Sequence, residues 1–182
     1  PSQFGCTQDV PTYDYNPAKA KKLLAEAGYP NGFETPFLAY RNRDYAEAMI
    51  NNLNAVGITT KFEYLKYAAF RDKVQDGKAP FNFGTWGSYS INDVSAITSH
   101  FQSGGKDDYS KDPEVMKQLG IGDTSVDLGV RKAAYKAALS RISDEAFMFP
   151  LWSYNTNYAF TKDVDFNPTP DEIPRFFTAK WM

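Results

Sequence analysis

The densest group of side chains able to bind a small molecule lies in residues 86–93. This segment holds two aromatic rings, three hydroxyl groups, an amide and a carboxylate. It directly follows residues 81–86, whose aromatic pattern predicts a strand. Open α/β sheets bind ligands at the carboxyl ends of their strands, and pockets combine apolar faces with a few polar groups. The alternative is a buried Trp86 followed by a polar turn that caps the next helix, and the pattern alone favours this alternative.

Catalytic and metal-binding chemistry has little support in the sequence. His100 is the only histidine and Cys6 the only cysteine, and no motif surrounds either. A cysteine nucleophile needs a nearby base, and a zinc site needs three or four ligands. Four acidic residues near the end of the chain lack the central glycine and terminal glutamate of a calcium loop; they are Asp163, Asp165, Asp171 and Glu172. The sequence therefore predicts no catalytic residue, no metal site and no cofactor.

Composition indicates a globular protein with a substantial core. The chain has 182 residues, of which 42% are hydrophobic and 23% charged, and the net charge is -2. These values argue against disorder, and the absence of a basic run argues against nucleic acid as a partner. No apolar run is long enough to cross a bilayer. Aromatic residues make up 16% of the chain, which suits an aromatic core and would also suit an aromatic binding surface.

The elements that would position residues 86–93 alternate between strand and helix. Asn16 and Pro17 predict the start of a first helix, and Gly28 predicts its end. The next elements expected are a strand over 33–39, a helix over 45–56, a strand over 58–65, a helix over 67–75 and a strand over 81–86. Three helices are expected after them, over 93–101, from 113 and over 126–144. Two strands, over 147–153 and 157–160, are expected last. This order predicts an α/β fold with a largely parallel sheet. No convincing linker interrupts the chain, so we expect a single domain over 1–182, with an irregular lead-in over 1–14 and a proline-rich tail over 163–182.

Several segments resemble motifs of one protein family. Residues 15–33, YNPAKAKKLLAEAGYPNGF, resemble the YDPxKAKxLLxEAGYPxGF segment of the family 5 extracytoplasmic solute-binding proteins, the peptide, nickel and opine receptors of bacterial ABC importers. Weaker matches follow in the family's order: 53–58 to LxxxGI, 67–70 to WxxF, 86–93 to WxxDxxxP, 131–135 to RxxxY, 149–152 to xPLY, and Trp181 to a terminal tryptophan. Their shared order and spacing carry the resemblance across nearly all of the chain.

The resemblance implies a fold and a function. It implies the C-terminal lobe of a two-lobed, periplasmic-binding-protein-like type II fold, with a mixed sheet flanked by helices. The chain would be a partial lobe that starts inside the lobe, and its tail would return toward the missing one. Such a protein binds peptides or a peptide-like or opine-like solute in the bacterial periplasm, or at the outer face of the cytoplasmic membrane, and delivers it to a membrane permease. It makes and breaks no bond, and closure of the lobes buries the solute.

The resemblance also implies a ligand site, with one departure. The expected ligand-binding residues are Tyr67, Phe83, Trp86, Gly87, Ser88, Tyr89, Ser90, Asn92 and Asp93. Peptide-binding members carry an aspartate for the α-ammonium of the peptide, and Tyr89 occupies that position here. A buried ammonium without a carboxylate is costly. Either Asp93 or another group takes the place of the missing aspartate, or the ligand is not a simple peptide. In the second case we expect an opine, a modified peptide or a sugar conjugate.

Two other functions stay open from the sequence. One is a small hydrolase or transferase that uses residues 86–100, although no nucleophile and base are paired in the sequence. The other is a solute-sensing module that passes occupancy to a second protein. For a partial lobe, we also expect weak solute binding by the isolated chain and self-association through an exposed apolar edge.

Overall fold

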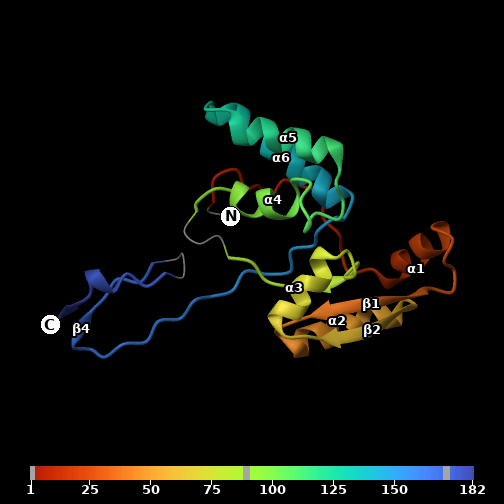
Figure 1. Ribbon diagram of the computed structural model, residues 1–182, viewed down its shortest axis with the longest axis horizontal. Helices are drawn as coiled ribbons and strands as arrows, with labels where there is room; N and C mark the ends of the chain where they lie inside the picture. Colours follow the sequence, from red (N-terminus) through yellow and green to blue (C-terminus); the bar gives the residue numbers. More distant parts are fainter. Residues whose placement is uncertain (1–2, 88–90, 170–172) are drawn as a thin grey trace. The chain divides into compact units, whose positions relative to one another are not determined.

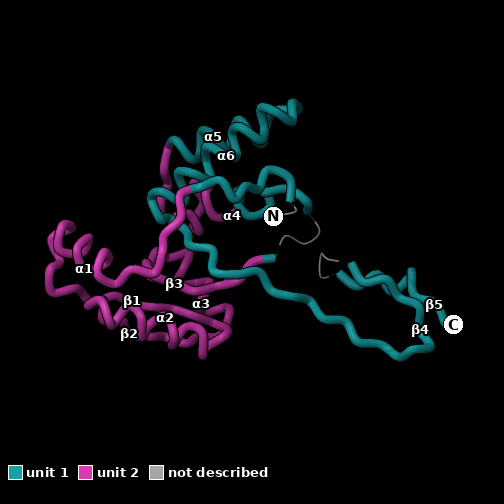
Figure 2. Tube along the Cα trace, turned by 180° about the vertical axis from the view of Figure 1, so that it is seen from behind, with its two compact units in different colours: residues 1–10, 87–99, 114–182 teal, residues 11–86, 100–113 magenta. Residues whose placement is uncertain are grey.

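The computed structural model describes residues 3–87, 91–169 and 173–182 (Figure 1). The chain groups into two compact units (Figure 2), unit 1 with residues 1–10, 87–99 and 114–182, and unit 2 with residues 11–86 and 100–113. Each unit is described by itself, and the single domain over 1–182 stays a prediction. No helix in the described ranges is both long and apolar enough to cross a membrane.

Unit 2 is built on a three-stranded parallel sheet with β1 in the centre, in the order β2-β1-β3. Its elements are α1 (Pro17–Glu26), β1 (Phe33–Ala39), α2 (Arg43–Ala55), β2 (Ile58–Tyr64), α3 (Tyr67–Gln75) and β3 (Asn82–Phe83). Strands β1 and β2 pair over seven residues, from Phe33 with Ile58 to Ala39 with Tyr64. The strand–helix–strand order and the parallel sheet confirm the predicted α/β class.

Local sequence signals explain the first helix and the start of the sheet. The Asn16 side chain accepts a hydrogen bond of 2.8 Å from the Lys19 backbone N–H, and Pro17 is the first helical residue. Strands β1 and β2 begin next to two glycines with positive φ, Gly32 and Gly57, and a side chain at Gly32 would clash with the Gly57 carbonyl oxygen. Only glycine therefore allows this close approach of the two backbones.

Strand β1 supplies two separate cores because its side chains alternate between the two faces of the sheet. Phe37 and Ala39 are buried against Ala46 of α2. Leu38, fully buried, packs instead against Phe70 of α3. Helices α2 and α3 thus cover opposite faces of the sheet (Figure 1), and the carboxyl edge of the strands is held by packing on both sides.

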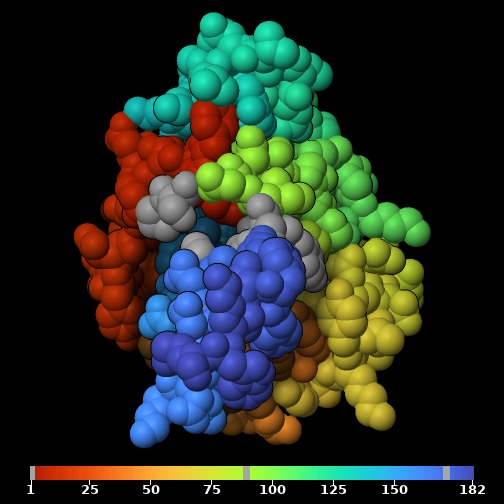
Figure 3. All heavy atoms as spheres, turned by 90° about the vertical axis from the view of Figure 1, so that its left-hand side faces the viewer, coloured from red at the N-terminus to blue at the C-terminus, as the bar shows by residue number. Residues whose placement is uncertain are grey.

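The regular structure of unit 1 consists mostly of helices. Its core surrounds Tyr135 of α6 (Leu128–Asp144), which is fully buried against α5 (Pro113–Thr124). Helix α4 (Ser95–Phe101) begins in this unit. The tail contains β4 (Val164–Asp165), the 3-10 helix η1 (Phe176–Thr178) and β5 (Lys180–Trp181), with β4 and β5 antiparallel. Figure 3 shows the tail in dark blue, and its aromatic side chains are largely exposed.

The structure differs from three predictions. The strands expected over 147–153 and 157–160 do not form, because a strand needs a paired backbone and none pairs with these segments among the described residues. The strand expected over 81–86 pairs only at β3. The lead-in is not wholly irregular, since Phe4 forms a parallel bridge with Asp93. The proline-rich tail contains the short β4–β5 pair.

Candidate functional site

The carboxyl ends of the three parallel strands meet at one edge of unit 2. Ala39 at the end of β1 lies beside both Tyr64 of β2 and Phe83 of β3. The residues that follow these strands therefore lie close together. We call five of their side chains the carboxyl-edge cluster: Tyr40, Arg41, Tyr67, Thr85 and Trp86.

Hydrogen bonds join the polar members of the cluster. The Tyr40 hydroxyl lies 3.0 Å from Thr85 Oγ1, and Arg41 Nη1 donates to the same oxygen at 3.0 Å. The Arg41 side chain is exposed, and its guanidinium carbon lies 5.8 Å from the centre of the Tyr40 ring. A guanidinium presents a planar fork of donors that suits a carboxylate. The cluster therefore offers an accessible positive charge.

Aromatic contacts connect the cluster to the core. The Tyr40 ring centre lies 5.0 Å from that of Tyr67 and 4.9 Å from that of Phe70. Phe70 is buried, whereas Tyr67, the first residue of α3, is 58% exposed. Tyr40 thus bridges a buried ring and a surface ring, which limits the motion of Tyr67.

Trp86 is the second exposed ring of the cluster. Its ring is stacked on that of His100, with centres 4.3 Å apart and planes 21° apart. Phe101 makes an edge contact with the same indole at 5.2 Å. Trp86 is nevertheless 39% exposed, so this flat apolar surface remains accessible at the end of β3.

An ion pair between Arg71 and Asp107 lies next to His100, the residue stacked on Trp86. Two nitrogens of Arg71 contact the two oxygens of Asp107 at 2.5 and 2.8 Å, and His100 Nε2 lies 3.3 Å from Asp107 Oδ2. The Arg71 hydrogen bonds lower the pKa of the Asp107 carboxyl below its ordinary value, against the opposing effect of burial. The same hydrogen bonds raise the pKa of Arg71. Asp107 is therefore a paired carboxylate and not a free base.

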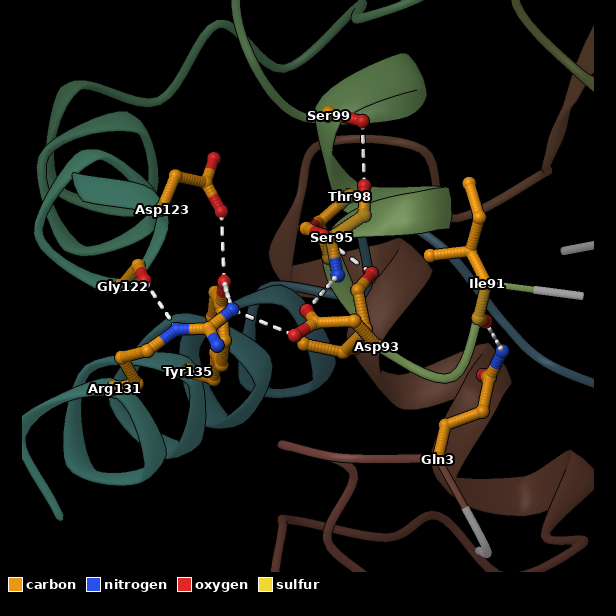
Figure 4. Close-up of polar contacts among 11 residues, drawn as sticks. Gln3, Ile91, Asp93, Ser95, Thr98, Ser99, Gly122, Asp123, Arg131 and Tyr135 are labelled. Carbon is orange, nitrogen blue, oxygen red and sulfur yellow. Dashed lines mark hydrogen bonds and ion pairs between the residues drawn. The ribbon is translucent and has the colours of Figure 1, made fainter. Parts of the chain in front are cut away.

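In unit 1, Asp93 lies in a separate polar network (Figure 4). Its Oδ1 accepts a hydrogen bond of 3.0 Å from the Ser95 backbone N–H at the start of α4, and its Oδ2 lies 2.6 Å from Arg131 Nη2. Burial alone would raise the pKa of Asp93, but the Ser95 and Arg131 contacts together hold this pKa below its ordinary value. Both oxygens of the carboxylate are thus engaged within the protein.

Tyr135 completes this network. Its hydroxyl donates to Asp123 Oδ1 at 2.8 Å and accepts from Arg131 Nη2 at 3.0 Å. Burial raises the pKa of the Tyr135 phenol, so the hydroxyl keeps its proton at neutral pH. Arg131 also donates to the Gly122 carbonyl at 2.9 Å. The network joins α4, α5 and α6.

The structure distributes the predicted site residues over both units. Tyr67 and Trp86 belong to the carboxyl-edge cluster, whereas Phe83 is buried in the core next to Phe37. Gly87 and Asn92 are exposed in unit 1, where the Asn92 carbonyl accepts the Phe4 N–H, and Asp93 pairs with Arg131. Ser88, Tyr89 and Ser90 lie outside the described residues.

Sequence reasoning missed the polar part of the cluster. Tyr40 and Arg41 directly follow β1, so the strand-end rule applied to Trp86 would also have indicated them. Asp107 and His100 carried no comparable signal, because only the folded chain brings His100 against Trp86 and Asp107 next to His100. Within the described ranges, no group of three or more histidine, cysteine, aspartate or glutamate side chains could hold a metal ion.

Comparison with known proteins places the chain in a family. The model of the bacterial extracellular solute-binding proteins, family 5 Middle, matches residues 1–108. Heme-binding protein A of Haemophilus influenzae is 32% identical over 94 residues, which cover 47% of this chain and 17% of that protein. The chain thus spans only a small part of this relative's length.

Two solved structures show the same fold. The periplasmic binding protein DppA from Helicobacter pylori, in complex with the peptide STSA, has a TM-score of 0.73 and 25% identity over 81% of this chain and 30% of its own. AgaA from A. tumefacien R10, in complex with agropinic acid, has a TM-score of 0.64 and 27% identity over 80% of this chain and 33% of its own. Such neighbours are two-lobed periplasmic binding proteins, which confirms the predicted fold class. The match over residues 1–108 is more than half of the chain, and the chain therefore belongs to the bacterial extracellular solute-binding proteins, family 5.

Proposed function

We propose that the chain is part of the solute-binding component of a bacterial ABC importer and contributes one wall of its solute site. The carboxyl-edge cluster carries this proposal, because it gathers two exposed aromatic rings and an exposed guanidinium where parallel strands end. In this proposal the solute is bound without chemical change outside the cytoplasmic membrane, and the liganded protein then docks on a permease. Family membership supports the binding role.

The charge of the cluster favours a solute that carries a carboxylate. Arg41 is exposed and donates a hydrogen bond to Thr85, whereas Asp107 is already paired with Arg71. A solute carboxylate would gain charge-assisted hydrogen bonds from Arg41. The faces of Tyr67 and Trp86 would cover its apolar part.

Two observations narrow the class of solute. Asp93, the candidate partner for a peptide α-ammonium, has both oxygens engaged by Ser95 and Arg131. His100, the only histidine, has a buried Nε2 that faces Asp107, so this nitrogen does not offer an axial ligand to a heme iron. We therefore propose an opine-like solute or a modified peptide rather than a simple peptide or heme.

Isothermal titration calorimetry on the complete gene product that contains residues 1–182 tests this proposal. Agropinic acid serves as the opine probe and the peptide Ser-Thr-Ser-Ala as the ordinary peptide. We expect tighter binding of the opine, and a loss of about 5- to 20-fold in its affinity for Arg41→Gln, since one charge-assisted contact is removed.

The matched control is Arg141→Gln, which makes the same change of charge on α6, where Arg141 pairs with Glu145. This variant should bind as the parent protein does. Tight binding of Ser-Thr-Ser-Ala with no effect of Arg41→Gln would contradict the proposed solute class and the role of Arg41.

A further inference from the structure

We propose that His100 is a positioning residue that fixes the orientation of the Trp86 indole, and that the Arg71–Asp107 ion pair anchors His100 in this role. The consequence for solute binding rests on the proposed function, because that function assigns Trp86 to the wall of the solute site. The orientation of Trp86 itself does not depend on that assignment.

The stack determines where the indole lies. His100 covers one face of Trp86 at 4.3 Å with nearly parallel planes, and Phe101 meets both rings edge-on, at 5.2 Å from Trp86 and 4.6 Å from His100. A ring held on one face and at an edge has few other rotamers available. The 39% of Trp86 that stays exposed is therefore presented in a defined direction.

Asp107 lies next to the imidazole on the side away from solvent. His100 Nε2 is buried and lies 3.3 Å from Asp107 Oδ2 without forming a hydrogen bond among the described residues, and the Asp107 side chain is only 8% exposed. A stacked ring alone can slide or rotate, whereas an imidazole whose buried nitrogen lies against a carboxylate that Arg71 holds in place has less room to move. Asp107 thus links the orientation of His100 to the charge of Arg71.

Arg71 connects this arrangement to the rigid part of unit 2. It follows Phe70, which is buried against Leu38 of the central strand, and its fork holds both oxygens of Asp107. The connection therefore runs from the core through Arg71, Asp107 and His100 to the indole. An indole oriented before the solute arrives loses less conformational entropy on binding.

The test uses the complete gene product and the variants His100→Ala, His100→Phe and Trp86→Phe. Near-ultraviolet circular dichroism without solute reports the environment of Trp86, and subtraction of the Trp86→Phe spectrum removes the signals of every other tryptophan, Trp152 and Trp181 among them. We expect His100→Ala to abolish most of the Trp86 signal and His100→Phe, which keeps a stacking ring, to restore much of it. Far-ultraviolet spectra verify that each variant is folded.

Calorimetry with agropinic acid provides the second measurement. We expect His100→Ala to weaken binding about 3- to 10-fold, the size of one aromatic contact, and His100→Phe to recover part of the loss. Tyr29→Ala is the matched control, because it removes another half-exposed ring of unit 2, one that contacts Phe33 at the start of β1. It should leave both the Trp86 signal and the affinity unchanged.

The two measurements separate the possible failures. An unchanged Trp86 spectrum in folded His100→Ala would overturn the positioning role, whatever the affinity. A changed spectrum with normal affinity in both His100→Ala and Trp86→Phe would instead contradict the assignment of Trp86 to the solute wall. Absence of any binding of agropinic acid would count against the proposed function, and the spectra would still decide the role of His100.

Discussion

Arg131 Nη2 of α6 lies 2.6 Å from Asp93 Oδ2, and the same carboxylate accepts the N–H that begins α4. The guanidinium carbon also lies 4.8 Å from the centre of the Phe4 ring. One arginine thus joins the start of the chain, the segment before α4 and the long helix. Asp93, one of the residues that the family resemblance assigned to ligand binding, is held by contacts that organise unit 1 (Figure 4).

Removal of the Tyr135 hydroxyl should destabilise the protein. Tyr135→Phe leaves the ring in the core but deletes the hydrogen bonds to Asp123 and Arg131. We expect a loss of about 1–2 kcal/mol in the free energy of unfolding, measured by urea denaturation. Tyr15→Phe, at a residue that is 78% exposed, should change this value by less than about 0.5 kcal/mol. Equal effects of the two substitutions would show that the buried network adds no stability.

Two glycines of α5 should respond to alanine in opposite directions. A Cβ atom at Gly122 would lie 2.5 Å from Tyr135 Cε1, whereas a Cβ atom at Gly120 meets nothing within 4 Å. Gly122→Ala should therefore destabilise the protein by about 1–3 kcal/mol through overpacking. Gly120→Ala should stabilise it by about 0.5–1 kcal/mol, because alanine favours the helix. Thermal unfolding of both variants measures the difference, and a stable Gly122→Ala protein would mean that α5 does not pack closely on Tyr135.

The Arg71–Asp107 pair should make stability depend on pH at the acid end. The pKa of Asp107 is lower in the folded protein than its ordinary value of 3.8. The unfolded chain therefore binds this proton more tightly, so the stabilisation is complete above the ordinary value and is lost as the pH falls through the lower, folded value.

Urea denaturation at several pH values measures this effect. Asp107→Asn should be less stable than the parent protein at pH 7, and the difference should shrink as the pH falls below about 4. Glu26→Gln is the control, because its pair with Lys22 is largely exposed. A difference between Asp107→Asn and the parent protein that stays constant from neutral to acid pH would contradict the assigned pair.

Helices and strands could be predicted from the sequence where their start, end or periodicity is encoded by neighbouring residues. Helix α3 has the predicted bounds, and α1 has the predicted cap at Asn16. The strands expected over 147–153 and 157–160 failed, because aromatic and β-branched composition cannot indicate whether a second backbone is available to pair. The bridge between Phe4 and Asp93 was missed for the same reason, since it joins residues far apart in the sequence.

In the candidate site too, features encoded by neighbouring residues could be predicted, whereas contacts between distant residues could not. The strand-end rule correctly brought Trp86 to the edge of the sheet, but it did not indicate that His100 would lie against the indole. Phe83, three residues before the predicted polar segment, is buried because its register beside Ala39 directs it into the core. A register is a property of the assembled sheet and is weakly encoded in a strand of two residues.

Native mass spectrometry of the complete gene product, purified without denaturation from its natural source, tests the solute-binding account most directly. We predict a small-molecule adduct whose mass fits a carboxylate-bearing opine or modified peptide, and a greatly reduced adduct in Trp86→Ala but not in Tyr29→Ala. A protein without any adduct that also fails to bind such solutes when they are added, or an adduct retained fully in Trp86→Ala, would contradict the claim that the carboxyl-edge cluster forms the solute wall.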